Sequence, residues 1–454
     1  MALRYGCRSS CQHGIRHVVW HHSARFRYGR IQSRSSVTGT LEIYNHKYQT
    51  DHITNVTPSL LSKIPRRIHL NAHNPINILK SRIESHFKDY TVMDSMNPVT
   101  TPRKNFDDLL FPQDHPSRLP GDTYYINREH ILRTHTSTHQ LEVLQSKRND
   151  RYLLTADVYR RDEINVSHYP VFHQMEGIRI FDRGSLDDIK AGMPSGVSEG
   201  GGNIALIVHD TPLHSAANPI QPLHTQHETE LVATHLKKSL ESLFIELFRY
   251  EVAANGNEPL QVRWVEAYFP FTSPSWEMEV LYQGKWLEVF GCGVTQQQII
   301  DNSGNPDKIG WAFGLGLERI GMPLFNIPDI RLFWSTDPRI TDQFKHPISS
   351  TEPFPKFQSF SKYPACYKDV SFWLREGTDV PCNEVMEIVR DSGGDLIEDV
   401  TLIDQFQHPK TRRHSQCFRI NYRSLDRTLT NEECDAIHEI VRSKLVDQYS
   451  VDLR

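Results

Sequence analysis

The chain has 454 residues, with 51 Lys and Arg against 55 Asp and Glu, so its formal net charge is -4. This balance excludes a globally basic nucleic-acid binder, although a local basic face stays possible. Charged residues at 23% and hydrophobic residues at 38% are typical of a globular protein long enough for two or three domains.

The seven cysteines form no C-x-x-C pair, and no apolar run has the length of a membrane-spanning helix. The sequence therefore indicates neither a zinc ribbon, nor a disulfide framework, nor a membrane anchor. Reduced thiols of this kind are expected in an intracellular compartment.

The first 40 residues have the composition of a mitochondrial transit peptide, because they are rich in Arg, contain Ser and lack acidic residues. The first acidic residue is Glu42. A disordered basic tail is the alternative. The arginines that precede Glu42 are Arg4, Arg8, Arg16, Arg25, Arg27, Arg30 and Arg34.

After this segment, apolar spacing predicts a helix from Asn74 to Tyr90 and a long helix that begins near Thr225 and ends near Asn255-Gly256. The pattern Thr225-x-x-Glu228 indicates a capping box at the start of the long helix, and an apolar stripe follows along one of its faces, from Leu236 to Phe248. Residues 184–222, which include Gly200-Gly201-Gly202, read as a polar surface loop. A further helix is expected at 314–326, entered through Gly314-Leu315-Gly316. Strands are predicted at 123–127, 151–158, 260–269, 276–282 and 285–290, the last two joined by a turn at Gln283-Gly284.

A Pro-rich stretch at 347–355 marks a change of pattern. Beyond it, strands at 366–374, 396–403 and 415–423 alternate with helices at 381–392 and 430–447. The pattern Thr430-x-x-Glu433 indicates a capping box at the start of the second helix. This order is typical of a small ferredoxin-like α+β domain. The predicted organisation is a transit peptide at 1–40, a large domain at 41–330, a linker at 331–358 and the α+β domain at 359–454.

Several residue types point to phosphate chemistry. Arg160 follows a predicted strand, where a guanidinium group can hold a phosphate, although most such arginines are solvated surface. Glu288 alternates along a strand and is either a surface charge or a carboxylate near Mg²⁺. The rings of Phe269-Pro270-Phe271 are either core packing or the wall of a site for an aromatic ligand.

Two other patterns leave alternatives open. His130, His135 and His139 have the spacing of a metallohydrolase site, but no H-E-x-x-H motif accompanies them. The segment between Gln405 and Leu429 contains six basic residues and one acidic residue, a composition that suits either RNA phosphate contact or a solvated strand face.

Taken in order, Pro98, Arg160, Glu288 and the run Gly314-Leu315-Gly316-Leu317-Glu318-Arg319 resemble motifs 1, 2 and 3 of class II aminoacyl-tRNA synthetases. Four further segments resemble the phenylalanyl-tRNA synthetases in their single-chain mitochondrial form. They are His135-Thr136-Ser137, Phe172-His173-Gln174-Met175-Glu176-Gly177, Phe269-Pro270-Phe271-Thr272 and Trp311-Ala312-Phe313-Gly314-Leu315-Gly316. The resemblance spans roughly residues 75–454.

The resemblance implies an α+β fold, in which an antiparallel sheet flanked by helices precedes a ferredoxin-like anticodon-binding domain. It also implies a phenylalanine–tRNA ligase of the mitochondrial matrix. Such an enzyme activates L-phenylalanine with ATP and Mg²⁺, and transfers it to the 3′ end of tRNA(Phe). It is expected to be a monomer with no membrane partner and with no metal held by protein ligands alone. A catalytically inactive paralogue that binds RNA is the alternative.

The same resemblance assigns the candidate residues. Arg160, Arg319 and Glu288 are the expected catalytic residues. The ATP site comprises Arg160, Ser167, His168, Tyr169, Phe172, Glu288, Phe313 and Arg319. The phenylalanine site comprises His135, Ser137, Thr138, His139, Gln140, Gln174, Met175, Glu176, Phe269, Phe271 and Ala312. Contacts to tRNA are expected from Lys410, Arg412, Arg413, Arg419 and Arg423, with His414 and Tyr422 stacking on anticodon bases.

Overall fold

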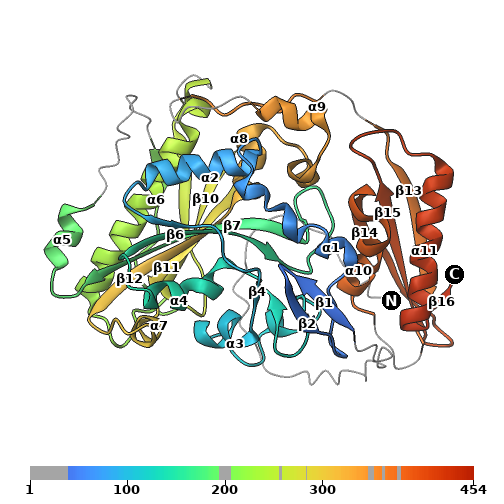
Figure 1. The fold of residues 1–454 in the computed structure, drawn as a ribbon, viewed down its shortest axis with the longest axis horizontal. Coiled ribbons are helices and arrows are strands. Elements are labelled where there is room, and N and C mark those ends of the chain that lie inside the picture. The colour runs from blue at the N-terminus through green and yellow to red at the C-terminus, as the bar shows by residue number, and fades with distance from the viewer. Residues whose placement is uncertain are drawn as a thin grey trace.

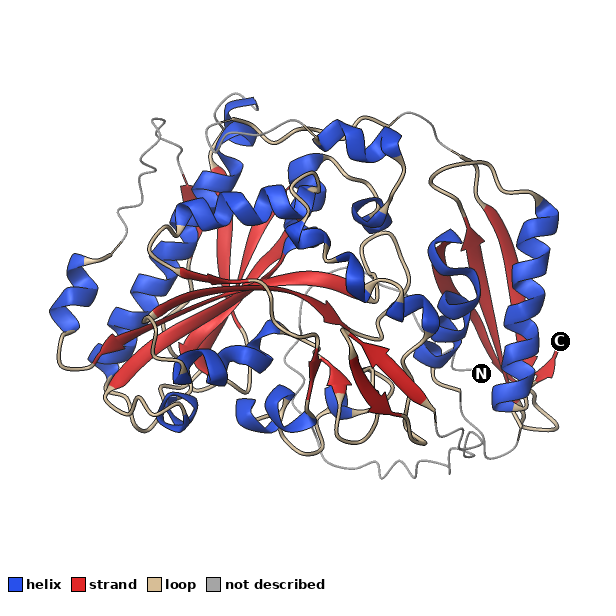
Figure 2. Cartoon of the chain, in the orientation of Figure 1, coloured by secondary structure: helices blue, strands red, loops and turns tan. Residues whose placement is uncertain are grey.

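The computed structural model describes residues 39–193, 206–254, 258–282, 284–345, 352–359, 363–375 and 380–454. Figure 1 shows a large sheet with helices packed along it and a smaller C-terminal body, coloured orange to red, beside it. Figure 2 shows that both bodies combine helices and strands, as expected for an α+β protein.

Within the described residues, eight strands form the large sheet in the order β3-β6-β7-β12-β11-β10-β9-β8. Neighbours are antiparallel except for the parallel pairs β3–β6 and β8–β9 at the two edges. The strands are β3 (Thr91–Met93), β6 (Arg151–Tyr159), β7 (Val171–Asp182), β12 (Lys308–Gly316), β11 (Lys285–Thr295), β10 (Thr272–Tyr282), β9 (Leu260–Glu266) and β8 (Leu206–His209).

One face of this sheet is covered by three helices, α2 (Pro75–His86), α6 (Gln226–Ala254) and α8 (Leu317–Phe325). Asn74 caps α2, and Thr225 with Glu228 forms the capping box predicted for α6. The apolar stripe predicted on α6 is fully buried against the sheet, because its spacing places every member on one helix face. Its residues are Leu236, Leu240, Leu243, Phe244, Leu247 and Phe248.

Shorter elements complete the large domain. The strands are β1 (Thr40–Ile43), β2 (His46–Gln49), β4 (Val99–Thr100) and β5 (Ile131–Leu132). The helices are α1 (Pro58–Leu61), α3 (Pro102–Asn105), α4 (Gln140–Gln145), α5 (Leu186–Ala191), α7 (Gln297–Asn302) and α9 (Pro338–Thr341). Single 3₁₀ turns include η5 (Thr136–His139) and η6 (Ile330–Trp334).

The C-terminal domain has the predicted ferredoxin-like order of elements. Its sheet runs β14-β15-β13-β16, and its two helices pack against each other and on that sheet. The capping box predicted at Thr430 and Glu433 is present at the start of the second helix. The elements are β13 (Cys366–Trp373), α10 (Cys382–Gly393), β14 (Ile397–Gln407), β15 (His414–Tyr422), α11 (Asn431–Tyr449) and β16 (Asp452–Leu453).

Three local predictions differ from the structure. Residues 123–127 are not a strand, since only Tyr125 makes an isolated bridge there. Gly314 and Gly316 are the last part of β12, paired with β7, and α8 begins only at Leu317. The 184–222 segment contains α5 and the edge strand β8, while Gly200-Gly201-Gly202 lies outside the described residues.

The described part of the segment predicted as a linker is packed rather than extended. Phe333, Phe344, Phe354 and Phe357 are buried in the same core as the helices of the large sheet. Residues 346–351, which hold Pro347, lie outside the described chain.

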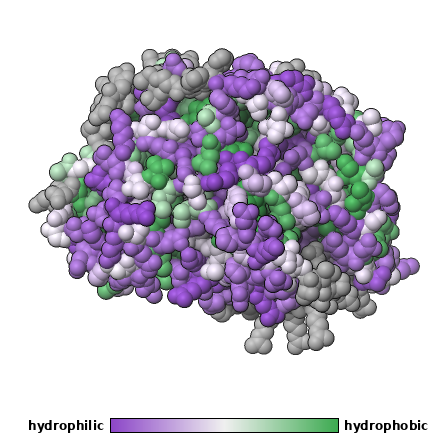
Figure 3. All heavy atoms as spheres, viewed as in Figure 1, coloured by the Kyte–Doolittle hydropathy of each residue, from purple (hydrophilic) through white to green (hydrophobic). Residues whose placement is uncertain are grey.

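In the view of Figure 3 the surface is mainly hydrophilic, with apolar residues in small separate patches. Among the described residues, no helix has both the length and the apolar character that crossing a membrane requires.

Candidate active site

A cavity of about 660 Å³ opens on the face of the large sheet opposite the three helices. It gathers residues from β7, β11, β12, the start of α8 and the loops around them. The predicted site residues that line it are His135, Ser137, Arg160, Ser167, His168, Tyr169, Phe172, Gln174, Glu176, Phe269, Phe271, Glu288, Ala312, Phe313 and Arg319.

One end of the cavity is cationic. The Arg160 guanidinium lies over the Phe172 ring, 5.3 Å from its centroid, and its Nε donates to the Thr134 carbonyl. Arg319 faces the same space and pairs with Glu288 at 2.8 Å. Burial and the nearby Arg319 charge lower the pKa of Arg160. An anion between the two arginines would therefore be stabilised by both charges.

The other end is aromatic. The Phe269 and Phe271 rings lie 5.8 Å apart, and a third ring, Phe111, stacks on His135 at 5.6 Å. Gly291 is required beside them, because a Cβ there would come within 2.8 Å of the Phe269 ring. These rings and Ala312 form an apolar slot of the kind that accepts an aromatic side chain.

A buried carboxyl group lies between the two ends. Glu176 is 2% exposed, and burial raises its pKa to about 7, although the nearby hydroxyl groups of Ser137 and Thr136 act in the opposite direction. Neither of its side-chain oxygens has a hydrogen-bond partner within the described structure. A buried acceptor of this type suits a cationic ligand group such as an ammonium.

A contact between His173 of β7 and Glu318 of α8 connects the two elements that carry Phe172 and Arg319 at the cationic end. One Glu318 oxygen accepts the His173 backbone N–H at 2.8 Å, and the other lies 2.7 Å from His173 Nδ1. Since His173 follows Phe172 and Glu318 precedes Arg319, this contact fixes the distance between β7 and α8 at the cavity. Glu318 lies in the run that resembles motif 3, directly before Arg319, but the sequence predicts no role for it.

Four predicted residues do not line the cavity. Thr138 contacts Thr100, and His139 Nδ1 contacts Glu142 at 2.7 Å, because the tight η5 turn points both away from the space that His135 and Ser137 face. Met175 is buried in the core with the helices, on the other side of β7. Gln140 is also buried outside the lining, and neither of its amide atoms has a partner in the described structure.

The cavity also contains residues that were not among the predicted site residues. Phe111 and His115 come from the segment between α3 and β5, and Arg161 and Asn383 also line the cavity. Asn383 belongs to α10 of the C-terminal domain, more than 200 positions from Arg160, so only the tertiary fold brings it there.

The predicted tRNA contacts are separate from this cavity, and most of their charge is neutralised. Arg413 pairs with Asp452, Arg419 with Asp369 and Arg423 with Glu398.

Two cations of the predicted set differ from the other three. Lys410 and Arg412 are exposed and form no ion pair within the described part of the chain. The expectation that Tyr422 stacks on bases is wrong, because its ring is fully buried and its hydroxyl contacts His438.

The histidine spacing does not produce a metal centre. His130 Nδ1 contacts Asn127, His139 contacts Glu142 and His135 stacks on Phe111, so the three rings have different partners. Within the described residues, no group of three or more His, Cys, Asp or Glu side chains is arranged to hold a metal ion.

Comparison with known proteins gives a consistent result. The class II core domain (F) of tRNA synthetases matches residues 60–200 and 222–344, and the ferredoxin-fold anticodon-binding domain matches 361–454. The mitochondrial phenylalanine–tRNA ligase of Saccharomyces cerevisiae is 43% identical, over 91% of this chain and 95% of its own length.

Two further relatives agree. The Mus musculus mitochondrial enzyme is 44% identical, over 93% of this chain and 91% of its own. The chloroplastic/mitochondrial enzyme of Arabidopsis thaliana is 42% identical, over 89% and 84% respectively. With a class II core, an anticodon-binding domain and relatives matched over most of their length, the chain belongs to the mitochondrial phenylalanine–tRNA ligase family.

Proposed function

We propose that this protein joins phenylalanine to tRNA(Phe) in the mitochondrial matrix, in two steps. Phenylalanine and ATP first give phenylalanyl-adenylate and pyrophosphate, and the acyl group then passes to a ribose hydroxyl at the tRNA 3′ end. The observation that carries this proposal is the meeting of Arg160 and Arg319 at one end of a cavity whose other end is the slot of Phe269 and Phe271.

In the proposed arrangement, phenylalanine occupies the aromatic slot with its ring against Phe269 and Phe271, and Ala312 limits the depth. Its ammonium group pairs with Glu176 beside Gln174, and His135 and Ser137 border the reacting carboxylate. The substrate carboxylate is already a nucleophile, so the chain has to position it rather than deprotonate it.

For ATP, Phe172 and Arg319 would enclose the adenine, and Arg160 would hold the α-phosphate where the charge develops. Ser167, His168, Tyr169 and Phe313 complete the lining of this end. Arg160 can do this without rearrangement, because its guanidinium is already fixed over Phe172 and by the Thr134 carbonyl. That preorganisation lowers the cost of reaching the transition state.

Mg²⁺ would enter with ATP rather than occupy a site made by protein alone. Glu288 and the buried Glu277 lie on neighbouring strands, and burial together with the Glu288 charge raises the pKa of Glu277 to about 7. This concentration of carboxylates fits an ion held mainly by phosphates with one or two protein oxygens. When bound, the ion would neutralise phosphate charge.

We assign tRNA contact to the C-terminal domain, at the turn between β14 and β15 that carries Lys410 and Arg412. The rings of Trp373, Phe406 and His408 lie about 6 Å from one another beside this turn. Unpaired cations next to partly exposed rings suit a single-stranded loop with unstacked bases. The remaining members of the predicted set would contribute only after exchanging their carboxylate partners for phosphate.

The other expectations are part of the same proposal. They are a monomer, a cleaved transit peptide within residues 1–40, of which 1–38 lie outside the described chain, and domain boundaries near 330 and 359. The deciding experiment is phenylalanine-dependent exchange of labelled pyrophosphate into ATP, followed by charging of a tRNA(Phe) transcript. An inactive RNA-binding paralogue would bind the transcript but would show no exchange.

A further inference from the structure

The loop that joins β6 to β7 lies against the C-terminal domain. This loop, residues 160–170, carries Arg160, His168 and Tyr169 of the cationic end of the cavity. Three of its backbone carbonyls accept hydrogen bonds from the C-terminal domain. Asn383 Nδ2 donates to Arg161, Arg390 Nη2 to Asp162 and the Val400 N–H to Ile164, at 3.4, 2.5 and 3.1 Å.

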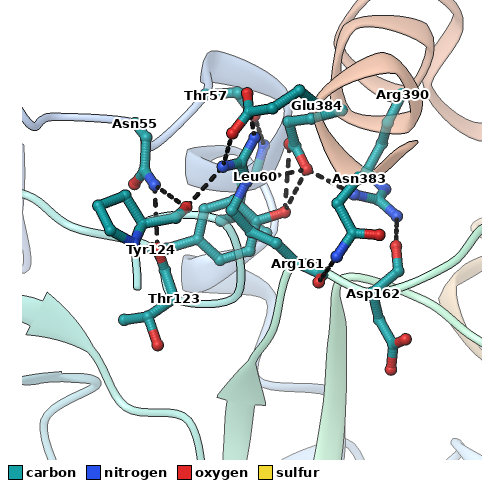
Figure 4. Close-up of polar contacts among 12 residues, drawn as sticks. Asn55, Thr57, Leu60, Thr123, Tyr124, Arg161, Asp162, Asn383, Glu384 and Arg390 are labelled. Atoms are coloured by element: carbon teal, nitrogen blue, oxygen red, sulfur yellow. Dashed lines mark hydrogen bonds and ion pairs between the residues drawn. The ribbon is translucent and has the colours of Figure 1, made fainter. Parts of the chain in front are cut away.

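Arg161 is the strongest tether. Its guanidinium lies in the contact between the domains and faces Glu384, as Figure 4 shows. Its guanidinium, 6% exposed, donates to both carboxylate oxygens of Glu384 at 2.8 and 3.1 Å and to the Pro120 carbonyl. Bidentate pairing of this type fixes direction as well as distance. Arg160, the next residue back, is thereby held from outside its own domain.

A second carboxylate, which is buried, completes the cluster. Glu387 accepts hydrogen bonds from the Tyr124 hydroxyl at 3.0 Å and from Arg390 at 2.5 Å, and lies 3.6 Å from Arg161 Nε. Two guanidinium groups and two carboxylates therefore balance one another; Arg161, Arg390 and Glu387 are buried, and the Glu384 side chain is 24% exposed. Removing one carboxylate leaves a buried charge without full compensation, which is costly.

The far end of the loop is held in the same way. The Tyr169 hydroxyl donates to Asp395 at the end of α10, and Lys63 pairs with the same carboxylate at 3.1 Å. The Ile164 side chain is part of the hydrophobic core of the C-terminal domain. Asn383 itself lines the cavity, so α10 forms part of its wall.

We propose that the C-terminal domain is part of the site of amino-acid activation, and that Asn383 and Glu384 are positioning residues for ATP. They hold the 160–170 loop in place before the nucleotide arrives, so less conformational entropy is lost on binding. This inference rests on the proposed function, and it gives a domain matched as anticodon-binding a role in a step that does not involve tRNA.

The test uses the full chain with Glu384→Gln, which keeps the shape of the side chain and removes its charge. In phenylalanine-dependent pyrophosphate exchange, KM for ATP should rise about tenfold, as expected for weakening a charged hydrogen bond, while KM for phenylalanine stays within twofold. Asn383→Ala should raise KM for ATP by about threefold. It serves as the second variant if Glu384→Gln does not fold.

Asp391→Asn is the matched control, because Asp391 lies on the same helix but pairs with Lys444 of α11 within the C-terminal domain. Its exchange kinetics should equal those of the wild type. If the folded Glu384 and Asn383 variants both keep KM for ATP within twofold of the wild type, the positioning role is wrong while the ligase proposal stands. Absence of exchange in the wild type overturns both.

Discussion

The pH dependence of phenylalanine binding tests the role of Glu176. Burial raises the pKa of this carboxyl from 4.5 to about 7, a rise equivalent to about 3 kcal/mol. A neutral carboxyl cannot pair with the ammonium group of the substrate. About a tenth of the free enzyme has Glu176 ionised at pH 6 and about nine tenths at pH 8. The dissociation constant of phenylalanine should therefore fall about tenfold between pH 6 and pH 8.

The assay is isothermal titration of phenylalanine into the enzyme without ATP, between pH 5.5 and 8.5. Binding of the ammonium group stabilises the ionised carboxylate, so complex formation at pH 7 should release about half a proton. Two buffers with different ionisation enthalpies measure that release directly. Glu176→Gln should bind weakly, and its affinity should be flat over the same range.

Other titrating groups near the cavity are distinguishable. Glu277 also has a pKa of about 7, but it lies on β10 near Glu288, so Glu277→Gln should keep the wild-type pH profile for phenylalanine. Burial and the Arg160 charge lower the pKa of His135 to about 3, so this ring stays neutral throughout. The assignment of Glu176 is refuted if the wild-type profile is flat, or if the Gln variant retains the tenfold slope.

The remaining predictions concern the cavity, the strands beside it and the β14–β15 turn. Because the folded pKa of Glu176 exceeds 4.5, its stabilising effect is lost as pH rises through 7, and Glu176→Gln should melt at a higher temperature than the wild type at pH 8. Ala312→Gly should lengthen the slot and allow para-substituted phenylalanines in pyrophosphate exchange; unchanged selectivity would show that Ala312 is not its floor. In Gly177→Ala the new Cβ would overlap the Phe313 ring of β12, so this variant should have a lower melting temperature. In Gly314→Ala the new Cβ would meet open space, so this variant should fold normally and have a higher KM for ATP. Arg412→Glu should weaken tRNA charging and leave pyrophosphate exchange unchanged; equal loss of both would contradict separate sites.

Elements defined by local signals were predictable. The capping boxes at Thr225 and Thr430 and the apolar stripe of α6 depend on residues three or four positions apart, and the structure confirms them. The alternating pattern of the C-terminal domain is local in the same sense.

Where partners are distant, the local pattern failed. The β8 strand exists because its parallel neighbour β9 pairs with it, about 50 positions away. The sequence Gly314-Leu315-Gly316 is typical of a turn before a helix. In the structure the two glycines instead belong to β12, where they lie opposite Glu176 and Gln174 of the antiparallel strand β7. In both cases the tertiary context overrides a weak local preference.

The candidate site follows the same division. Arg160, Glu176 and Arg319 were predicted correctly as residues of one site, and all three line the cavity. Each could be predicted because the motif that contains it is recognisable from a few neighbouring residues. The tether of Arg161 to Glu384 was invisible, since 223 positions separate the two residues. A contact of that separation leaves no pattern in a single sequence.

The number of basic residues in a segment is a poor predictor of an RNA-binding surface, because it does not show which of them form ion pairs in the fold. The basic stretch between Gln405 and Leu429 reads as one RNA-binding stripe, yet Arg419 lies directly opposite Asp369 on the neighbouring strand β13 and forms a bidentate pair with it. An arginine so paired must give up its carboxylate before it can bind a phosphate, and the exchange of one anion for another yields little net free energy. Affinity for RNA should therefore concentrate at the β14–β15 turn, where Lys410 and Arg412 have no ion pair to exchange among the described residues. Salt-dependent tRNA binding by single charge-removal variants measures this directly. Loss of Arg412 should reduce the salt slope by about one, and loss of Arg419 should leave it nearly unchanged.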